Sequence, residues 1–235
     1  MKRINLLFTL SSLSVLLVTL ERFSFTTKIL LQPYNFMRLH EIVQMVFIIL
    51  FTVVIPFLLL KEITNNFATL KTKKGYLLIL LFVIGVYFYA TGNGVHEVSS
   101  FNFNNYCDTQ NFSGDLCGGF FINDYYTGNI FYFAGGAMMV ISLLYLEKLK
   151  PSNGFTKKDM KILAANALIY AFAIFAYAAF DKVLVGLIYS LIISIISINL
   201  FLQIKNKYLE YPVITYTTLT YTIGTLAALV VRLLR

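Results

Sequence analysis

The stretch IVQMVFIILFTVVIPFLLL, residues 42–60, decides the fold class of this chain. It contains no charged residue, and its length approaches the about 20 apolar residues that a helix needs to cross the hydrocarbon layer of a membrane. Because lipid offers the backbone no hydrogen-bond partners, a charge-free apolar run of this length is expected to be helical. Residues 42–60 are therefore predicted to span a membrane as a helix.

Six more apolar runs of similar length lie before and after this stretch. They cover residues 4–20, 76–91, 129–146, 162–180, 183–202 and 213–231. Only Asp181 and Lys182 separate the fifth run of the chain from the sixth, but the two together are too long for a single crossing. The sequence thus predicts an all-α integral membrane protein, in which residues 1–235 form one domain of seven transmembrane helices.

The composition of the whole chain agrees with this fold class. Hydrophobic residues make up 58% of the 235 residues and charged residues 13%, whereas soluble domains carry roughly 45–50% and about 25%. Two cysteines exclude a disulfide-rich scaffold, and two histidines exclude a His-rich metal cluster. We expect a multi-pass protein of the cytoplasmic membrane or an equivalent membrane.

The basic residues predict the direction in which the chain crosses the membrane, since Lys and Arg concentrate in cytoplasmic loops. Thirteen of the 19 Lys and Arg residues lie in the amino terminus and in the loops after the second, fourth and sixth runs. The amino terminus is therefore expected to be cytoplasmic and the carboxyl terminus extracytoplasmic. The net charge of +8 then reflects topology, and nucleic acid is not an expected partner.

Residues 92–128 are expected to form a long extracytoplasmic loop. No Lys or Arg occurs between Lys74 and Lys148, and the loop contains eight Phe and Tyr residues. Because aromatic side chains favour the membrane interface, we expect the loop to pack over the outer helix ends as a lid. Cys107 and Cys117 are predicted to form a disulfide in this loop, with two unlinked thiols as the alternative.

Ionisable residues near membrane depth are the first candidates for a functional site. His40 and Glu41 open the second span, His96 and Glu97 follow the third, and Asp124 precedes the fourth, so all five lie at the outer side. We predict that His96, Asp124, His40 and Glu41 include the catalytic or acid–base groups of any reaction. His40, His96 and Asp124 are a tentative metal site, for which zinc is the cofactor that matches imidazole and carboxylate ligands.

Further polar side chains close to these positions are candidates for ligand binding. They are Gln44, Asn93, Glu97, Asn123, Thr127 and Asn129. The alternative is that all these groups are ordinary interfacial residues and hold no cofactor, with Asp124 and Thr127 capping the fourth helix. Gly92 and Gly94 are expected to end the third helix or to let a ligand approach the backbone, and Gly135 to let another helix pack closely.

Two segments carry a resemblance to known proteins. GNGVH at residues 92–96, followed by NDYYTG at residues 123–128 and by Tyr132, resembles a pattern of uncharacterised bacterial multi-pass membrane proteins. In that pattern Gly-x-Gly-x-His is followed by Asp-Glu-x-x-Ser-His-x-x-x-His at the next helix. The arrangement is similar to that of seven-helix membrane metal hydrolases of the alkaline ceramidase type.

The resemblance implies that His96 matches the first metal-ligating His, Asp124 the Glu and Thr127 the Ser. Gly128 and Tyr132 stand where the paired histidines would be. Because two of the three His ligands are missing, the resemblance implies a non-catalytic relative without an intact metal site.

Two classes of function agree with these features. In the first, the extracytoplasmic face binds a lipid or other amphiphile, or the chain is a non-catalytic subunit of a membrane complex. Its partners would then be membrane lipids and other membrane protein subunits. In the second, the chain is a membrane-embedded, metal-dependent hydrolase acting on a lipid at the outer leaflet. A retinal protein is excluded because the seventh span contains no Lys, and a voltage sensor because no span carries regularly spaced Arg residues.

Overall fold

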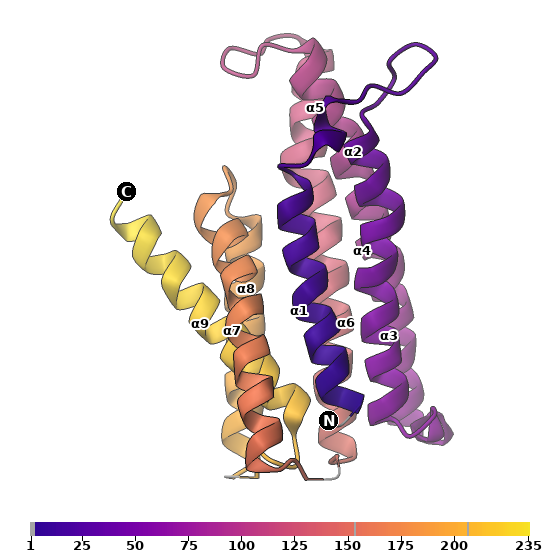
Figure 1. Ribbon diagram of the computed structural model, residues 1–235, viewed down its shortest axis with the longest axis vertical. Helices are drawn as coiled ribbons and strands as arrows, with labels where there is room; N and C mark the ends of the chain where they lie inside the picture. The colour runs from indigo at the N-terminus through magenta and orange to yellow at the C-terminus, as the bar shows by residue number, and fades with distance from the viewer. Residues whose placement is uncertain (1–2, 153, 206) are drawn as a thin grey trace.

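The computed structural model describes residues 3–152, 154–205 and 207–235 as a bundle of helices (Figure 1). Seven helical segments are long and apolar enough to cross a membrane, as the sequence predicts. The elements are α1 (Arg3–Glu21), η1 (Phe25–Lys28), α2 (Leu39–Ile42), η2 (Val43–Ile48), α3 (Ile49–Ile63), η3 (Ala68–Lys71), α4 (Lys73–Tyr106), α5 (Asp115–Ile122), η4 (Asn123–Gly128), α6 (Asn129–Leu149), α7 (Lys157–Phe180), α8 (Val185–Gln203) and α9 (Pro212–Leu233). Two of the spans are composite, because α2, η2 and α3 run on as one helix and so do α5, η4 and α6.

The seven spans form two groups that lie side by side. Helices α1, α3, α4 and α6 make one group, and α7, α8 and α9 make the other (Figure 1). Contacts of α1 with α7 and of α6 with α8 join the groups. The end of the bundle that holds the amino terminus is called the inner end below, and the opposite end the outer end.

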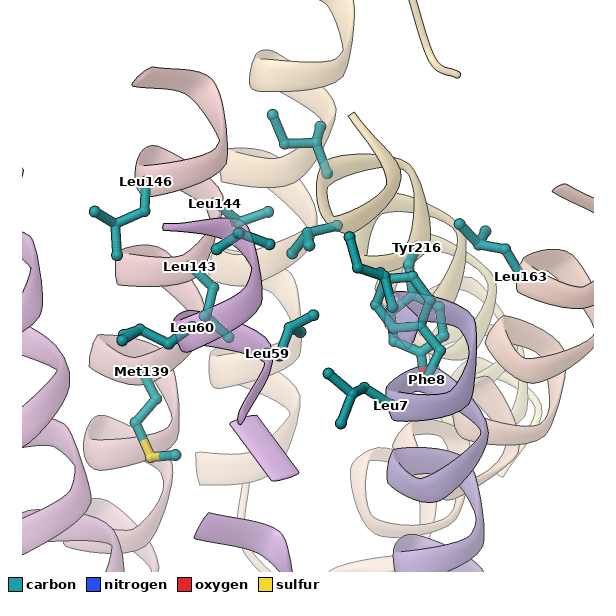
Figure 2. Packing of buried hydrophobic residues seen from close by; sticks show 14 of the residues in the cluster. Leu7, Phe8, Leu59, Leu60, Met139, Leu143, Leu144, Leu146, Leu163 and Tyr216 are labelled. Carbon is teal, nitrogen blue, oxygen red and sulfur yellow. The ribbon is translucent and has the colours of Figure 1, made fainter. Parts of the chain in front are cut away.

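The largest hydrophobic core lies toward the inner end, where both groups meet. Figure 2 shows Leu7 and Phe8 of α1 close to Leu59 of α3 and Tyr216 of α9. The rings of Phe8 and Tyr216 stack with their centroids 4.2 Å apart. Because lipid gives little hydrophobic drive for helices to associate, such close packing is a main source of attraction between the two groups.

Helices α4 and α6 approach each other along a seam of glycines. Gly85 and Gly92 on α4 face Gly128 and Gly135 on the partner helix, and each pair is seven residues apart, which keeps both members on one face. A β carbon on Gly92 would lie 2.1 Å from the backbone nitrogen of Tyr132. The prediction that Gly135 allows close helix packing is thus confirmed.

The third transmembrane helix is longer than the sequence predicts. Gly92 and Gly94 lie inside α4, which continues without a break to Tyr106. The glycines do not end this helix, because their backbone is α-helical and Gly92 is held against the neighbouring helix. Gly94 has no atom within 4 Å of the place where a β carbon would stand.

The segment expected as a loop, residues 92–128, is mostly helical. Residues 107–114 connect α4 to α5, and the sulfurs of Cys107 and Cys117 are bonded at 2.02 Å. Phe103 is buried against the rings of Phe112 and Phe121. The upper part of α4, the connection and α5 therefore form a helical hairpin with its own aromatic core. This outer hairpin, residues 97–122, rises above the outer ends of α7 and α8 (Figure 1).

The inner end contains a buried carboxylate that is not among the predicted site residues. The Glu147 side chain is 0% exposed near the end of α6. Its Oε1 accepts a hydrogen bond from the backbone N–H of Val213 at 2.9 Å, and its Oε2 accepts one from Ile214 at 2.8 Å. Glu147 thus satisfies amide groups in the first turn of α9, which have no partner within that helix.

Candidate functional site

The first part of the candidate site is the pair of His96 and Asp124 at the outer end of the glycine seam. His96 lies one turn beyond Gly92 and Asp124 one turn before Gly128, so the close approach of the two helices brings the side chains together. His96 Nδ1 lies 2.8 Å from Asp124 Oδ1 and 3.0 Å from the Asp124 main-chain oxygen. Because a carbonyl oxygen can only accept, Nδ1 carries the proton and Nε2 is the nitrogen able to accept one.

The second part is a pair formed by His40 and Glu21. Glu21 ends α1, and its carboxylate is in ion-pair contact with His40 Nδ1, although the N–H direction does not meet hydrogen-bond geometry. The amide of Gln44 donates a hydrogen bond to Glu21 Oε2 at 2.9 Å. The sequence does not identify Glu21 as a site residue, because a carboxylate at the end of an apolar run is typical of a simple span boundary.

Glu41 has a separate and fully used set of contacts. Its Oε2 accepts from the Arg38 backbone N–H at 2.9 Å, and its Oε1 accepts from Arg38 Nε at 2.7 Å. The carboxylate is buried, and the Arg38 guanidinium also lies 5.7 Å from the centre of the Phe101 ring. This clamp begins α2 and connects it to α4, so Glu41 has a structural partner and is a poor candidate for acid–base work.

Two more carboxylates lie near these pairs. Glu97 is buried in α4 and follows His96 directly in the chain. Asp181, between α7 and α8, was expected only as part of a connection. Burial raises the pKa of Asp181, while the nearby charges of His96, Arg22 and Arg232 partly offset that rise.

Arg232, near the end of α9, uses its guanidinium to contact the end of α7. Its Nε donates to the main-chain oxygen of Ala178 at 2.6 Å, and its Nη2 donates to that of Asp181 at 2.8 Å. These carbonyls at the end of α7 have no partner inside the helix, so an arginine satisfies them and attaches α9 to α7.

Both composite spans contain a π-helical turn at the site. Gln44 lies in η2 and Asp124 lies in η4. Because Asp124 is inside a continuous helix, it does not cap α6, and neither does Thr127. Single π turns within α-helices are frequent at functional sites, and no sequence pattern in these segments indicates them.

The other predicted ligand-binding residues do not join the cluster through a hydrogen bond among the described residues. Asn129 donates to the Tyr125 main-chain oxygen of its own helix at 3.0 Å, and Asn123 is exposed. Thr127 is half-buried, and Asn93 is buried inside α4 with its amide nitrogen unpaired in the described part of the chain.

The tentative metal site is not assembled. Within the described ranges 3–152, 154–205 and 207–235, no group of three or more His, Cys, Asp or Glu side chains is placed to hold a metal ion. Each histidine instead faces its own carboxylate, His40 toward α1 and His96 toward η4. The geometry supports paired imidazole and carboxylate groups that hold helix ends together.

Comparisons with known proteins add no further assignment. No protein-family model, curated protein or solved structure matches this chain. The resemblance to alkaline-ceramidase-type hydrolases therefore stays a prediction. It rests on the sequence segments at residues 92–96 and 123–128, and Gly128, where a paired His would stand, belongs to the glycine seam.

Proposed function

We propose that this chain is a multi-pass membrane protein that works as a non-catalytic subunit, binding another membrane protein through its outer face. In this proposal the inner end is cytoplasmic, and the carboxyl terminus and the outer hairpin are extracytoplasmic. Two features of the sequence support this orientation. Thirteen of the 19 basic residues lie at the inner side, and no Lys or Arg occurs between Lys74 and Lys148.

The observation that carries the proposal is the exposed apolar surface of the outer hairpin. Tyr106 is 63% exposed and Leu116 is 69% exposed. Both lie on the outer hairpin, which projects beyond the neighbouring helix ends (Figure 1). Interface cores are enriched in aromatic residues, and the outer hairpin is rich in Phe and Tyr and contains no Lys or Arg. The disulfide of Cys107 and Cys117 holds the tip in one conformation, which lowers the entropy that binding would cost.

The first outer loop, residues 22–38 between α1 and α2, offers a second surface of the same kind. Phe23 and Phe25 follow α1, and Tyr34 and Phe36 lie at the loop tip, all of them exposed. Exposed apolar residues gathered on projecting segments mark interaction sites more often than isolated ones do. The His–carboxylate pairs and the clamp of Arg38 and Glu41 then act as the rigid base beneath both surfaces.

The orientation is tested by labelling introduced cysteines in intact cells. Lys28 and Lys73 are both exposed lysines, one at each end of the bundle, so Lys28→Cys and Lys73→Cys make a matched pair. A membrane-impermeant maleimide is expected to label Lys28→Cys at once and Lys73→Cys only after the cells are permeabilised. The native cysteines are bonded to each other and give no background. Labelling of Lys73→Cys in intact cells would reverse the orientation.

The binding surface is tested by photocrosslinking from the hairpin in living cells. A benzophenone amino acid in place of Leu116 is expected to give one discrete protein adduct on illumination. Asn104 is the control, because it is exposed on the same hairpin but lies on the opposite face of α4 from Tyr106. Equal adducts at both positions, or none at Leu116, would contradict the proposal, and adducts with lipid alone would replace the protein partner by an amphiphile.

A further inference from the structure

A groove lies at the inner end of the bundle, away from the binding surface proposed above. It is a space of about 470 Å³ between the first turns of α4 and the last turns of α6. Its lining consists of Lys74, Leu77, Leu78, Tyr145, Lys148 and Leu149. The glycine seam holds the two helices together farther out, and here larger side chains take the place of the glycines and border the groove.

The charged rim of the groove is entirely basic. Lys74 lies in the first turn of α4 and Lys148 in the last turn of α6, and none of the ion pairs found among the described residues uses either of them. Glu147, the carboxylate next to Lys148 in the chain, is turned inward to the amides of α9. The positive charge at the rim is thus left for a partner outside the bundle.

The floor of the groove is apolar and faces the side where lipid is expected. Leu77 is half exposed, and Leu77, Leu78 and Tyr145 lie about one helical turn farther from the inner end than Lys74 and Lys148. Tyr is favoured where one end of a side chain is apolar and the other is wet. The two lysines therefore lie at the level expected for a headgroup, and Leu77, Leu78 and Tyr145 lie at the level where an acyl chain begins.

We propose that the α4–α6 groove binds one anionic phospholipid, with its phosphate held by Lys74 and Lys148 and an acyl chain along Leu77 and Leu78. The charge complementarity between a phosphate and two ammonium groups that have no ion pair among the described residues carries the choice of an anionic lipid. Basic pockets between transmembrane helices at the cytoplasmic side are suited to such headgroups. Lys148 also donates a hydrogen bond to the Gln203 amide oxygen, and two of its three N–H groups remain for the phosphate.

Binding of tail-labelled fluorescent phosphatidylglycerol to the purified full-length chain in detergent tests the proposal, with tail-labelled phosphatidylcholine as the headgroup control. We expect phosphatidylglycerol to bind at least about tenfold more tightly than phosphatidylcholine. The double variant Lys74→Gln/Lys148→Gln is expected to lose that preference, because each lysine near an anionic headgroup contributes about a fivefold change in affinity.

The matched control is Lys157→Gln/Lys158→Gln, which removes the same charge from exposed positions at the start of α7, on the same end of the bundle. It is expected to keep the preference for phosphatidylglycerol. Equal losses in both double variants would show a diffuse basic surface instead of a site and would overturn the proposal. So would equal binding of the two lipids by the unaltered chain. Lipid binding at this groove does not involve the outer hairpin. Failure of this proposal can therefore be distinguished from failure of the proposed function, which the crosslinking experiment tests.

Discussion

Replacing Gly92 with alanine is expected to destabilise the protein by about 1–3 kcal/mol and to lower its unfolding temperature in detergent. The added methyl group would lie 2.1 Å from the backbone nitrogen of Tyr132 and 2.7 Å from the main-chain oxygen of Gly128. Because both contacts are with backbone, no side chain can turn away, and α4 must separate from α6. The same movement would draw His96 from Asp124.

Gly94→Ala is the control for this substitution. It lies on the same helix, two residues away, with no atom within 4 Å of the new β carbon. Alanine has a helix propensity about 1 kcal/mol more favourable than that of glycine, so Gly94→Ala is expected to leave stability unchanged or to raise it slightly. If the two variants unfolded at the same temperature, the glycine seam would not be holding the helices together.

Replacing Glu147 with alanine is expected to cost about 2–4 kcal/mol, because the backbone N–H groups of Val213 and Ile214 would lose their acceptors inside the protein. Each unsatisfied buried amide costs about 1–3 kcal/mol. Part of this cost is offset, because the variant no longer buries a carboxylate. The loss is expected at the contact of α6 with α9, so the two helix groups would separate more readily. Unfolding in detergent, followed by gel filtration of heated samples, measures the change.

Glu62→Ala is the matched control for Glu147→Ala. Glu62 is also a glutamate near the inner end of a span, but its side chain is 32% exposed and faces only Arg3 at 3.5 Å. Ion pairs of this kind contribute about 0–1 kcal/mol, so a small effect is expected. Glu147→Gln keeps one carbonyl acceptor and should fall between the two alanine variants. A Glu147→Ala protein as stable as Glu62→Ala would remove the structural role of the buried carboxylate.

The hydropathy of the chain predicted all seven spans, because a helix that crosses the membrane needs a long apolar run. Such a run can be recognised from the local sequence alone. The same criterion failed at residues 92–106. Asn93, Glu97 and the serines and asparagines that follow lower the hydropathy, so the segment read as a loop. In the structure it stays helical, because each backbone group keeps its partner within α4 and Phe103 packs against α5 and the connection before it.

The candidate site shows the same division. Sequence placed His40, His96 and Asp124 at one end of the bundle, because span boundaries set the depth of each residue. It did not identify Glu21 as the partner of His40, or predict that His96 and Asp124 form a pair separate from His40. Those pairings depend on which helices are adjacent and on how each is rotated about its axis, and neither property is written in a hydropathy profile.

The sequence by itself determined the all-helical class, the seven spans and the uneven distribution of basic residues, since each follows from local composition and length. Only the tertiary structure decided which glycines face each other, which carboxylate each histidine meets, and that Glu147 turns inward. The physical reason is that lipid selects apolar helices without regard to their neighbours. Close packing and the pairing of buried polar groups then choose one arrangement of those helices, and both act between residues far apart in the chain.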